Sequence, residues 1–153
     1  IAENVALGRP EANRAEVERA ARVAGLAADL ARFPAGLDTP LGERGVNLSG
    51  GQRQRVAIAR AILVDPTWLV LDDCLSQVDA ATEEEILAGL AEVRRSRTCL
   101  VVAHRLSTVR HADEIVVLAE GRIVERGTHA TLVRSGGWYA RTWEEQFLAG
   151  TVV

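Results

Sequence analysis

The chain has 153 residues, of which 48% are apolar and 25% are charged, and its formal net charge is −3. This is an ordinary globular composition, sufficient for one core, and the slight negative charge provides no field that would attract nucleic acid. No stretch approaches the roughly 18 consecutive apolar residues that cross a bilayer, and the two cysteines, Cys74 and Cys99, are not at metal or redox spacing.

The first third of the chain is predicted to be helical, with one long loop. Residues 12–33 have apolar side chains at helical spacing, which predicts two short helices interrupted near Gly25. Residues 34–47 are rich in proline and glycine and should form a long ordered loop. Ser49 is expected to cap a helix that runs to about residue 64 and ends before Pro66.

A strand-helix-strand unit is predicted next. Residues 68–71 and 98–103 are apolar runs without alternation, which is typical of parallel strands covered on both faces. Residues 80–93 should form the connecting helix, with Asp79 as its cap. A right-handed crossover is the default for such a unit.

The last part of the chain predicts a hairpin and two helices. Glu120 and Gly121 separate apolar runs at residues 115–118 and 122–125, which is a hairpin pattern, and terminal helices follow from Thr128. Together with the parallel strands, this pattern indicates the α/β class.

Residues 48–52, which read Leu-Ser-Gly-Gly-Gln, are the candidate anion contact. Two glycines let the backbone approach a ligand closely, and a helix that starts here directs its free N–H groups and positive dipole end toward a phosphate. Gln52 adds a side-chain donor. A glycine-containing helix cap without a ligand is the alternative for a bare Ser-Gly-Gly.

Polar residues follow each of the two predicted parallel strands. Asp72 and Asp73 come directly after the first strand, where parallel sheets bind ligands, and His104 follows the second strand. Residues 76–79, Ser-Gln-Val-Asp, lie between them. Taken alone, the tetrapeptide is explained equally well as a helix cap, and an isolated histidine at a strand end is often structural.

The basic residues exclude one common phosphate-binding element. All eighteen are arginine, so the chain cannot contain the loop Gly-x-x-x-x-Gly-Lys-Ser/Thr, whose lysine reaches the β and γ phosphates of a nucleotide. We therefore expect this chain to supply only half of a catalytic site, and to show no turnover alone.

In this order, these elements resemble the ATPase domain of ABC transporters, most closely the exporter type in which that domain follows a membrane-spanning domain. The resemblance covers nearly the whole chain and implies the C-terminal part of a P-loop NTPase (RecA-like, ABC-type) domain, beginning just after the family's Q-loop. Residues 1–64 would be the helical subdomain with the signature segment, residues 48–52. Residues 65–153 would be the C-terminal part of the ATP-binding core.

The resemblance also implies roles for individual residues, with ATP and Mg²⁺ as cofactors. The signature segment would bind the γ-phosphate of an ATP held by a second ATPase domain, in a homodimer or a heterodimer. The residues of this chain assigned to that contact are Ser49, Gly50, Gly51 and Gln52. Asp79, in the family's D-loop at residues 76–79, would lie at the dimer interface, and His104 would contact the γ-phosphate as the switch histidine.

The strand-end carboxylates depart from the family pattern at one position. Asp72 matches the Walker B aspartate that holds Mg²⁺, generally through water. Asp73 stands where the family usually has a glutamate that acts as the general base, and aspartate is shorter by roughly 1.5 Å. Since a base must lie within hydrogen-bond reach of its proton, slow hydrolysis is expected. A shifted backbone that makes Asp73 competent is the alternative.

Residues 39–45 resemble the exporter X-loop, with Glu43 facing the coupling helices of a transmembrane domain. A glycine-rich surface connection is the alternative. The resemblance places the protein at the cytoplasmic face of the plasma membrane, within an integral membrane transporter. A soluble ABC-type ATPase (SMC-like or translation factor) and a non-catalytic regulatory module are the competing functions.

Overall fold

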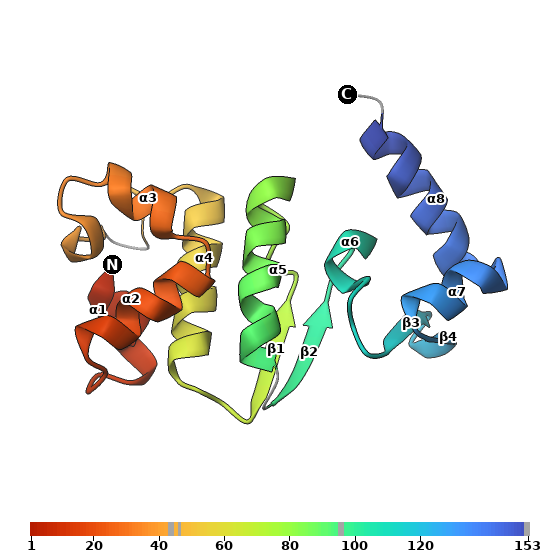
Figure 1. Ribbon diagram of the computed structural model, residues 1–153, viewed down its shortest axis with the longest axis horizontal. Helices are drawn as coiled ribbons and strands as arrows, with labels where there is room; N and C mark the ends of the chain where they lie inside the picture. The colour runs from red at the N-terminus through yellow and green to blue at the C-terminus, as the bar shows by residue number, and fades with distance from the viewer. Residues whose placement is uncertain (43–44, 46, 95–96, 152–153) are drawn as a thin grey trace. The chain divides into compact units, whose positions relative to one another are not determined.

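The computed structural model describes residues 1–42, 45, 47–94 and 97–151. They fall into two compact units, Ile1–Val102 and Ala103–Val153, each with its own core (Figure 1). Across the described ranges, no helix combines the length and apolarity needed to cross a bilayer. Glu43 lies outside the described residues, and its role stays a prediction.

The front of the first unit is helical, as predicted. Its elements are α1 (Ala2–Val5), η1 (Ala6–Gly8), α2 (Arg14–Val23), α3 (Ala27–Arg32), η2 (Gly36–Asp38) and α4 (Gly50–Leu63). Gly25 has a φ of +70°, which interrupts the chain between α2 and α3 at the predicted position. The side chains of Asn13 and Glu16 form a capping box at the start of α2.

The strand-helix-strand unit is also present. β1 (Trp68–Asp72) pairs in parallel with β2 (Thr98–Val102), and α5 (Ala80–Arg94) connects them. Figure 1 shows α5 running alongside the two strands. Ile86 and Leu90 of α5 share a core with Leu69 and Leu71 of β1, so α5 covers one face of the sheet.

The prediction that both strand faces are covered is wrong for the described chain. Leu69 and Leu71 are buried, but Trp68 and Val70 on the opposite face of β1 are 69% and 58% exposed. Leu100 and Val102 of β2 are exposed as well. An unbroken apolar run shows that both faces suit burial, and it does not say which segment buries each face.

The second unit consists of α6 (Leu106–Val109), a hairpin of β3 (Ile115–Ala119) and β4 (Arg122–Gly127), α7 (His129–Ser135) and α8 (Trp138–Thr151). Glu120 and Gly121 both have positive φ, of +50° and +73°, as a two-residue hairpin turn requires. Tyr139 is fully buried at the centre of this unit's core. The hairpin and the two terminal helices are therefore confirmed.

Candidate functional site

The signature segment starts α4 with a reciprocal cap. The Ser49 hydroxyl accepts from the Gln52 backbone N–H at 3.2 Å, and the Gln52 side-chain oxygen accepts from the Ser49 backbone N–H at 2.8 Å. This capping box confirms the predicted helix start. Ser49 is exposed and Gly50 is half-buried, so the positive end of α4 is accessible at this position.

Asp29 of α3 holds the first turns of α4. Its carboxylate accepts from the Gln52 side-chain N–H at 2.8 Å and forms an ion pair with Arg55, which is itself buried. The amide of Gln52 is therefore fixed from both ends, by Asp29 and by the Ser49 N–H. Sequence reasoning missed Asp29, because a single acidic residue in a short apolar helix gives no sign of its partner.

Asp72 and Asp73 lie at the carboxyl end of β1, and both are exposed. The backbone N–H of Asp73 donates to the Val102 carbonyl at 2.9 Å, which extends the β1–β2 pairing by one residue. Asp73 also has a φ of +46°. This left-handed conformation is uncommon outside glycine, although aspartate tolerates it better than most residues, and such outliers gather at functional sites.

The segment after Asp73 is a compact turn that leads into α5. The Asp73 carbonyl accepts from the Ser76 N–H at 3.4 Å and from the Ser76 hydroxyl at 3.0 Å. Asp79 caps α5 by accepting from the N–H and the hydroxyl of Thr82, at 3.0 and 2.8 Å. These hydrogen bonds hold the pKa of Asp79 below its usual value, with the Thr82 backbone bond as the largest cause.

The structure brings the signature segment and the 76–79 turn into direct contact. A Cβ added at Gly50 would lie 1.7 Å from the Gln77 side-chain oxygen, and one at Gly51 would lie 2.7 Å from the Gln77 carbonyl oxygen. Packing against the Gln77 backbone therefore requires glycine at position 51, whereas position 50 meets only the end of the Gln77 side chain. Sequence reasoning did not pair these segments, which are more than 20 residues apart.

His104 belongs to the second unit, where its side chain is exposed. Its carbonyl accepts from the Gln146 side-chain N–H at 2.9 Å, and the Gln146 oxygen accepts from the Leu106 N–H at 2.9 Å. One side chain of α8 thus fixes the backbone on both sides of Arg105. The predicted approach of His104 to a phosphate stays a prediction.

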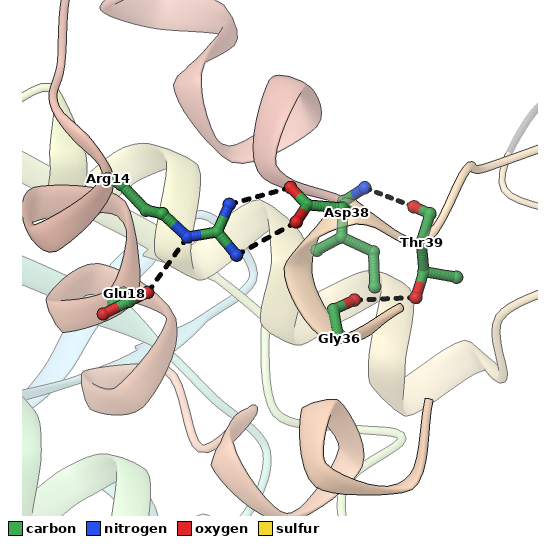
Figure 2. A network of polar contacts seen from close by, with 6 residues as sticks. Arg14, Glu18, Gly36, Asp38 and Thr39 are labelled. Carbon is green, nitrogen blue, oxygen red and sulfur yellow. Dashed lines mark hydrogen bonds and ion pairs between the residues drawn. The ribbon is translucent and has the colours of Figure 1, made fainter. Parts of the chain in front are cut away.

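The loop before the signature segment is braced at both ends. Figure 2 shows the Arg14 guanidinium of α2 binding both carboxylate oxygens of Asp38, at 2.8 and 3.0 Å, and also contacting Glu18. Near the other end, the Asn47 side chain accepts from the Gly42 N–H at 3.2 Å and donates to the Pro40 carbonyl at 2.9 Å.

Comparison with known proteins decides the family. The model of the ABC transporter family matches residues 1–76, which contain α4, β1 and Ser76. The chain belongs to the ABC transporter family. It is 48% identical to the multidrug resistance-like ATP-binding protein MdlA of Escherichia coli (strain K12), over 97% of this chain and 25% of that protein. It is 50% identical to the ATP-dependent lipid A-core flippase of Shewanella sp. (strain MR-4), over 96% of this chain and 25% of the flippase.

A solved structure agrees with this assignment. A bacterial Atm1-family ABC exporter with ATP bound matches with a TM-score of 0.86 and 46% identity, over 95% of this chain and 25% of that one. The resemblance to an ABC exporter ATPase domain and the P-loop NTPase fold class are confirmed. The chain spans about a quarter of the length of these relatives. The division predicted after residue 64 stays a prediction.

Cys74 lies beside the two aspartates of this ABC domain without the features of a reactive thiol. Burial is the largest cause that raises its pKa to about 11. Because the thiolate is the reactive form, Cys74 behaves as a small apolar residue at neutral pH.

Proposed function

We propose that the protein to which this chain belongs is an ATP-hydrolysing ABC exporter subunit. The observation that supports this most directly is that three segments to which we assign phosphate or metal contacts lie together in one compact unit. The exposed start of α4, the carboxyl end of β1 and the 76–79 turn adjoin one another there. The relatives lend support, since one is named a multidrug resistance-like ATP-binding protein and another an ATP-dependent lipid A-core flippase.

The signature segment would bind the γ-phosphate of an ATP held by a second ATPase domain. Ser49 is exposed and Gly50 is half-buried, so they offer an accessible helix start, with the buried Gly51 directly behind them. This start suits an anion because the helix dipole and the N–H groups favour negative charge there. Gln52, held by Asp29, would set the orientation of this first turn. His104 would contact the same kind of phosphate, and Asp79 would lie at the interface between the two domains.

The two strand-end carboxylates would serve the metal and the water. Both are exposed oxygen donors at the carboxyl end of a parallel strand, a donor set that fits Mg²⁺. Asp72 would hold the ion, which neutralises charge on the phosphates when it is bound. Asp73 would accept the proton of the attacking water, and its side chain is one methylene shorter than the usual glutamate.

The short side chain of Asp73 suggests that the ATP site of this subunit hydrolyses ATP slowly. A subunit with Asp73 and an intact signature segment suits a heterodimer, in which it completes the faster site of its partner. A homodimer with two slow sites is the simpler arrangement of the same parts. In either case the ATPase domains would dock on a transmembrane domain through residues 39–45, at the cytoplasmic face of the membrane. The exposed face of β1 and β2 would be covered by further parts of the ATPase domain.

ATP hydrolysis by the purified full-length protein in lipid tests this proposal. We expect a measurable rate, and we expect Asp73→Glu to raise kcat by roughly 10- to 100-fold, because a misplacement of about 1 Å can cost about 100-fold. Asp72→Asn serves as the inactive reference. An unchanged rate in Asp73→Glu would remove the short base as the limiting feature, and a wild-type protein that does not hydrolyse ATP would refute the exporter assignment.

A further inference from the structure

Gln54, on the second turn of α4, makes three contacts with the segment that follows β1. Its side-chain N–H₂ group donates to the Ser76 hydroxyl at 3.0 Å and to the Asp73 carbonyl at 3.4 Å. Its side-chain oxygen accepts from the Gln77 backbone N–H at 3.0 Å. One amide therefore bonds three residues of a single turn.

These contacts lie on the same side of α4 as the glycine contacts. Gly50 and Gln54 are four residues apart, so they occupy one face of the helix. Gly50 and Gly51 pack on Gln77, and Gln54 bonds to the same turn one helical turn further on. Because the glycines carry no side chain, the start of α4 approaches Gln77 closely.

The chemistry of the turn requires an amide at position 54. The Gln77 N–H needs an acceptor, whereas the Asp73 carbonyl, which already accepts from Ser76, takes a further donor from the amide. A carboxylate would satisfy the N–H but place negative charge beside the carbonyl oxygen, and an apolar side chain would bond to neither group.

We propose that Gln54 is a positioning residue that couples the signature segment to Asp73, and thereby couples the two ATP sites of the dimer. This inference rests on the proposed function, in which the signature segment contacts one ATP and Asp73 serves the other. When α4 closes on its phosphate, the amide of Gln54 moves the left-handed backbone at Asp73 with it. The position of the Asp73 carboxylate at one ATP site then depends on whether nucleotide is bound at the other site.

The test uses the full-length protein and the ATP dependence of hydrolysis. Gln54→Leu should lower kcat about tenfold, since a shift of the base by a fraction of an ångström is costly. KM should stay within about twofold, because the Gln54 amide bonds to the turn and the proposed site assigns it no nucleotide contact. The Hill coefficient for ATP should fall toward one. Gln54→Glu should show the same pattern more weakly, because it keeps the bond to the Gln77 N–H.

Ser76→Ala and a double variant separate coupling from folding. Ser76→Ala removes one acceptor of the Gln54 amide, so adding it to Gln54→Leu should lower kcat no further. Ser135→Ala is the matched control, because the Ser135 hydroxyl also donates to a carbonyl three residues earlier, in α7 at 2.7 Å. It should leave kcat and the Hill coefficient unchanged.

The outcomes distinguish the coupling from the exporter assignment. An active wild-type protein whose Gln54→Leu variant keeps its kcat and Hill coefficient would overturn the coupling alone. Additive losses of kcat in the Gln54→Leu/Ser76→Ala double variant would also overturn the coupling. A loss of kcat in Ser135→Ala equal to that in Gln54→Leu would do the same. An inactive wild-type protein would overturn the proposed function together with the coupling.

Discussion

The contact between the glycines of the signature segment and the 76–79 turn predicts that alanine destabilises the fold at position 51 but is tolerated at position 50. In Gly51→Ala, the new Cβ would lie 2.7 Å from the Gln77 carbonyl oxygen, and it would need about 0.7 Å more to reach an ordinary contact of 3.4 Å. Backbone must move to provide that space. In Gly50→Ala, the Cβ would meet only the end of the flexible Gln77 side chain, which can rotate away.

The two costs differ enough to measure. Overpacking of this kind costs about 1–3 kcal/mol, and alanine in a helix returns at most about 1 kcal/mol relative to glycine. We therefore expect Gly51→Ala to lose about 1–2 kcal/mol of unfolding free energy, which lowers the Tm of a chain of this size by about 3–6 °C. Gly50→Ala should change the Tm by less than about 2 °C, because the displaced group is a side chain.

Thermal unfolding of the 153-residue chain, followed by circular dichroism, makes the comparison. Both variants add the same methyl group to the first turn of α4, so helix propensity largely cancels between them. If Gly51→Ala melted at or above the Tm of Gly50→Ala, the close approach of α4 to the Gln77 carbonyl would be refuted.

Three further predictions concern packing, pH and thiol chemistry. Asp29→Ala leaves the buried Arg55 without its ion pair and should lower the free energy of unfolding, measured in urea, by about 3 kcal/mol. Asp38→Ala removes an exposed ion pair and should lower it by at most about 1 kcal/mol. Equal losses in the two variants would contradict this difference. The lowered pKa of Asp79 stabilises the fold above its usual pKa of about 3.9, and this contribution disappears as the pH falls through the lower folded value. Asp79→Ala should therefore lower the urea midpoint at pH 7 but not near pH 2, and a constant difference would exclude the carboxylate as the cause. With a pKa of about 11, Cys74 should react with iodoacetamide at pH 8 about two orders of magnitude more slowly than a free thiol. Its reaction rate, followed by mass spectrometry, should rise tenfold per pH unit. Labelling of Cys74 as fast as that of a free thiol would refute its burial.

The parts of the fold that sequence predicted are those fixed by neighbouring residues. Ser49 and Asp79 cap α4 and α5 through side chains that act within three residues. Gly25 and the Glu120-Gly121 turn sit at backbone angles that their own chemistry favours. Such features depend on local geometry alone, so the periodicity and cap rules located them.

The parts that sequence could not predict depend on contacts between distant segments. The ion pair of Asp29 with Arg55 and the packing of Gly50 on Gln77 each join segments more than 20 residues apart. The prediction that both faces of β1 are covered failed for a related reason. Trp68 has the same apolar character whether or not a neighbour covers it. The candidate residues were predictable as a series of motifs, and their mutual contacts were not.

A mixed-subunit experiment tests most directly whether the signature segment serves an ATP held by a second polypeptide. Two full-length variants, Gly50→Asp and Asp72→Asn, are co-expressed with different tags, and assemblies containing both are selected. Each variant alone should hydrolyse ATP about 100-fold more slowly than wild type, because a phosphate contact or the metal ligand is lost. The mixed assembly should recover about half of the wild-type rate, since one of its two sites combines an intact signature segment with an intact Asp72. A mixed assembly no more active than either variant alone would contradict the shared site.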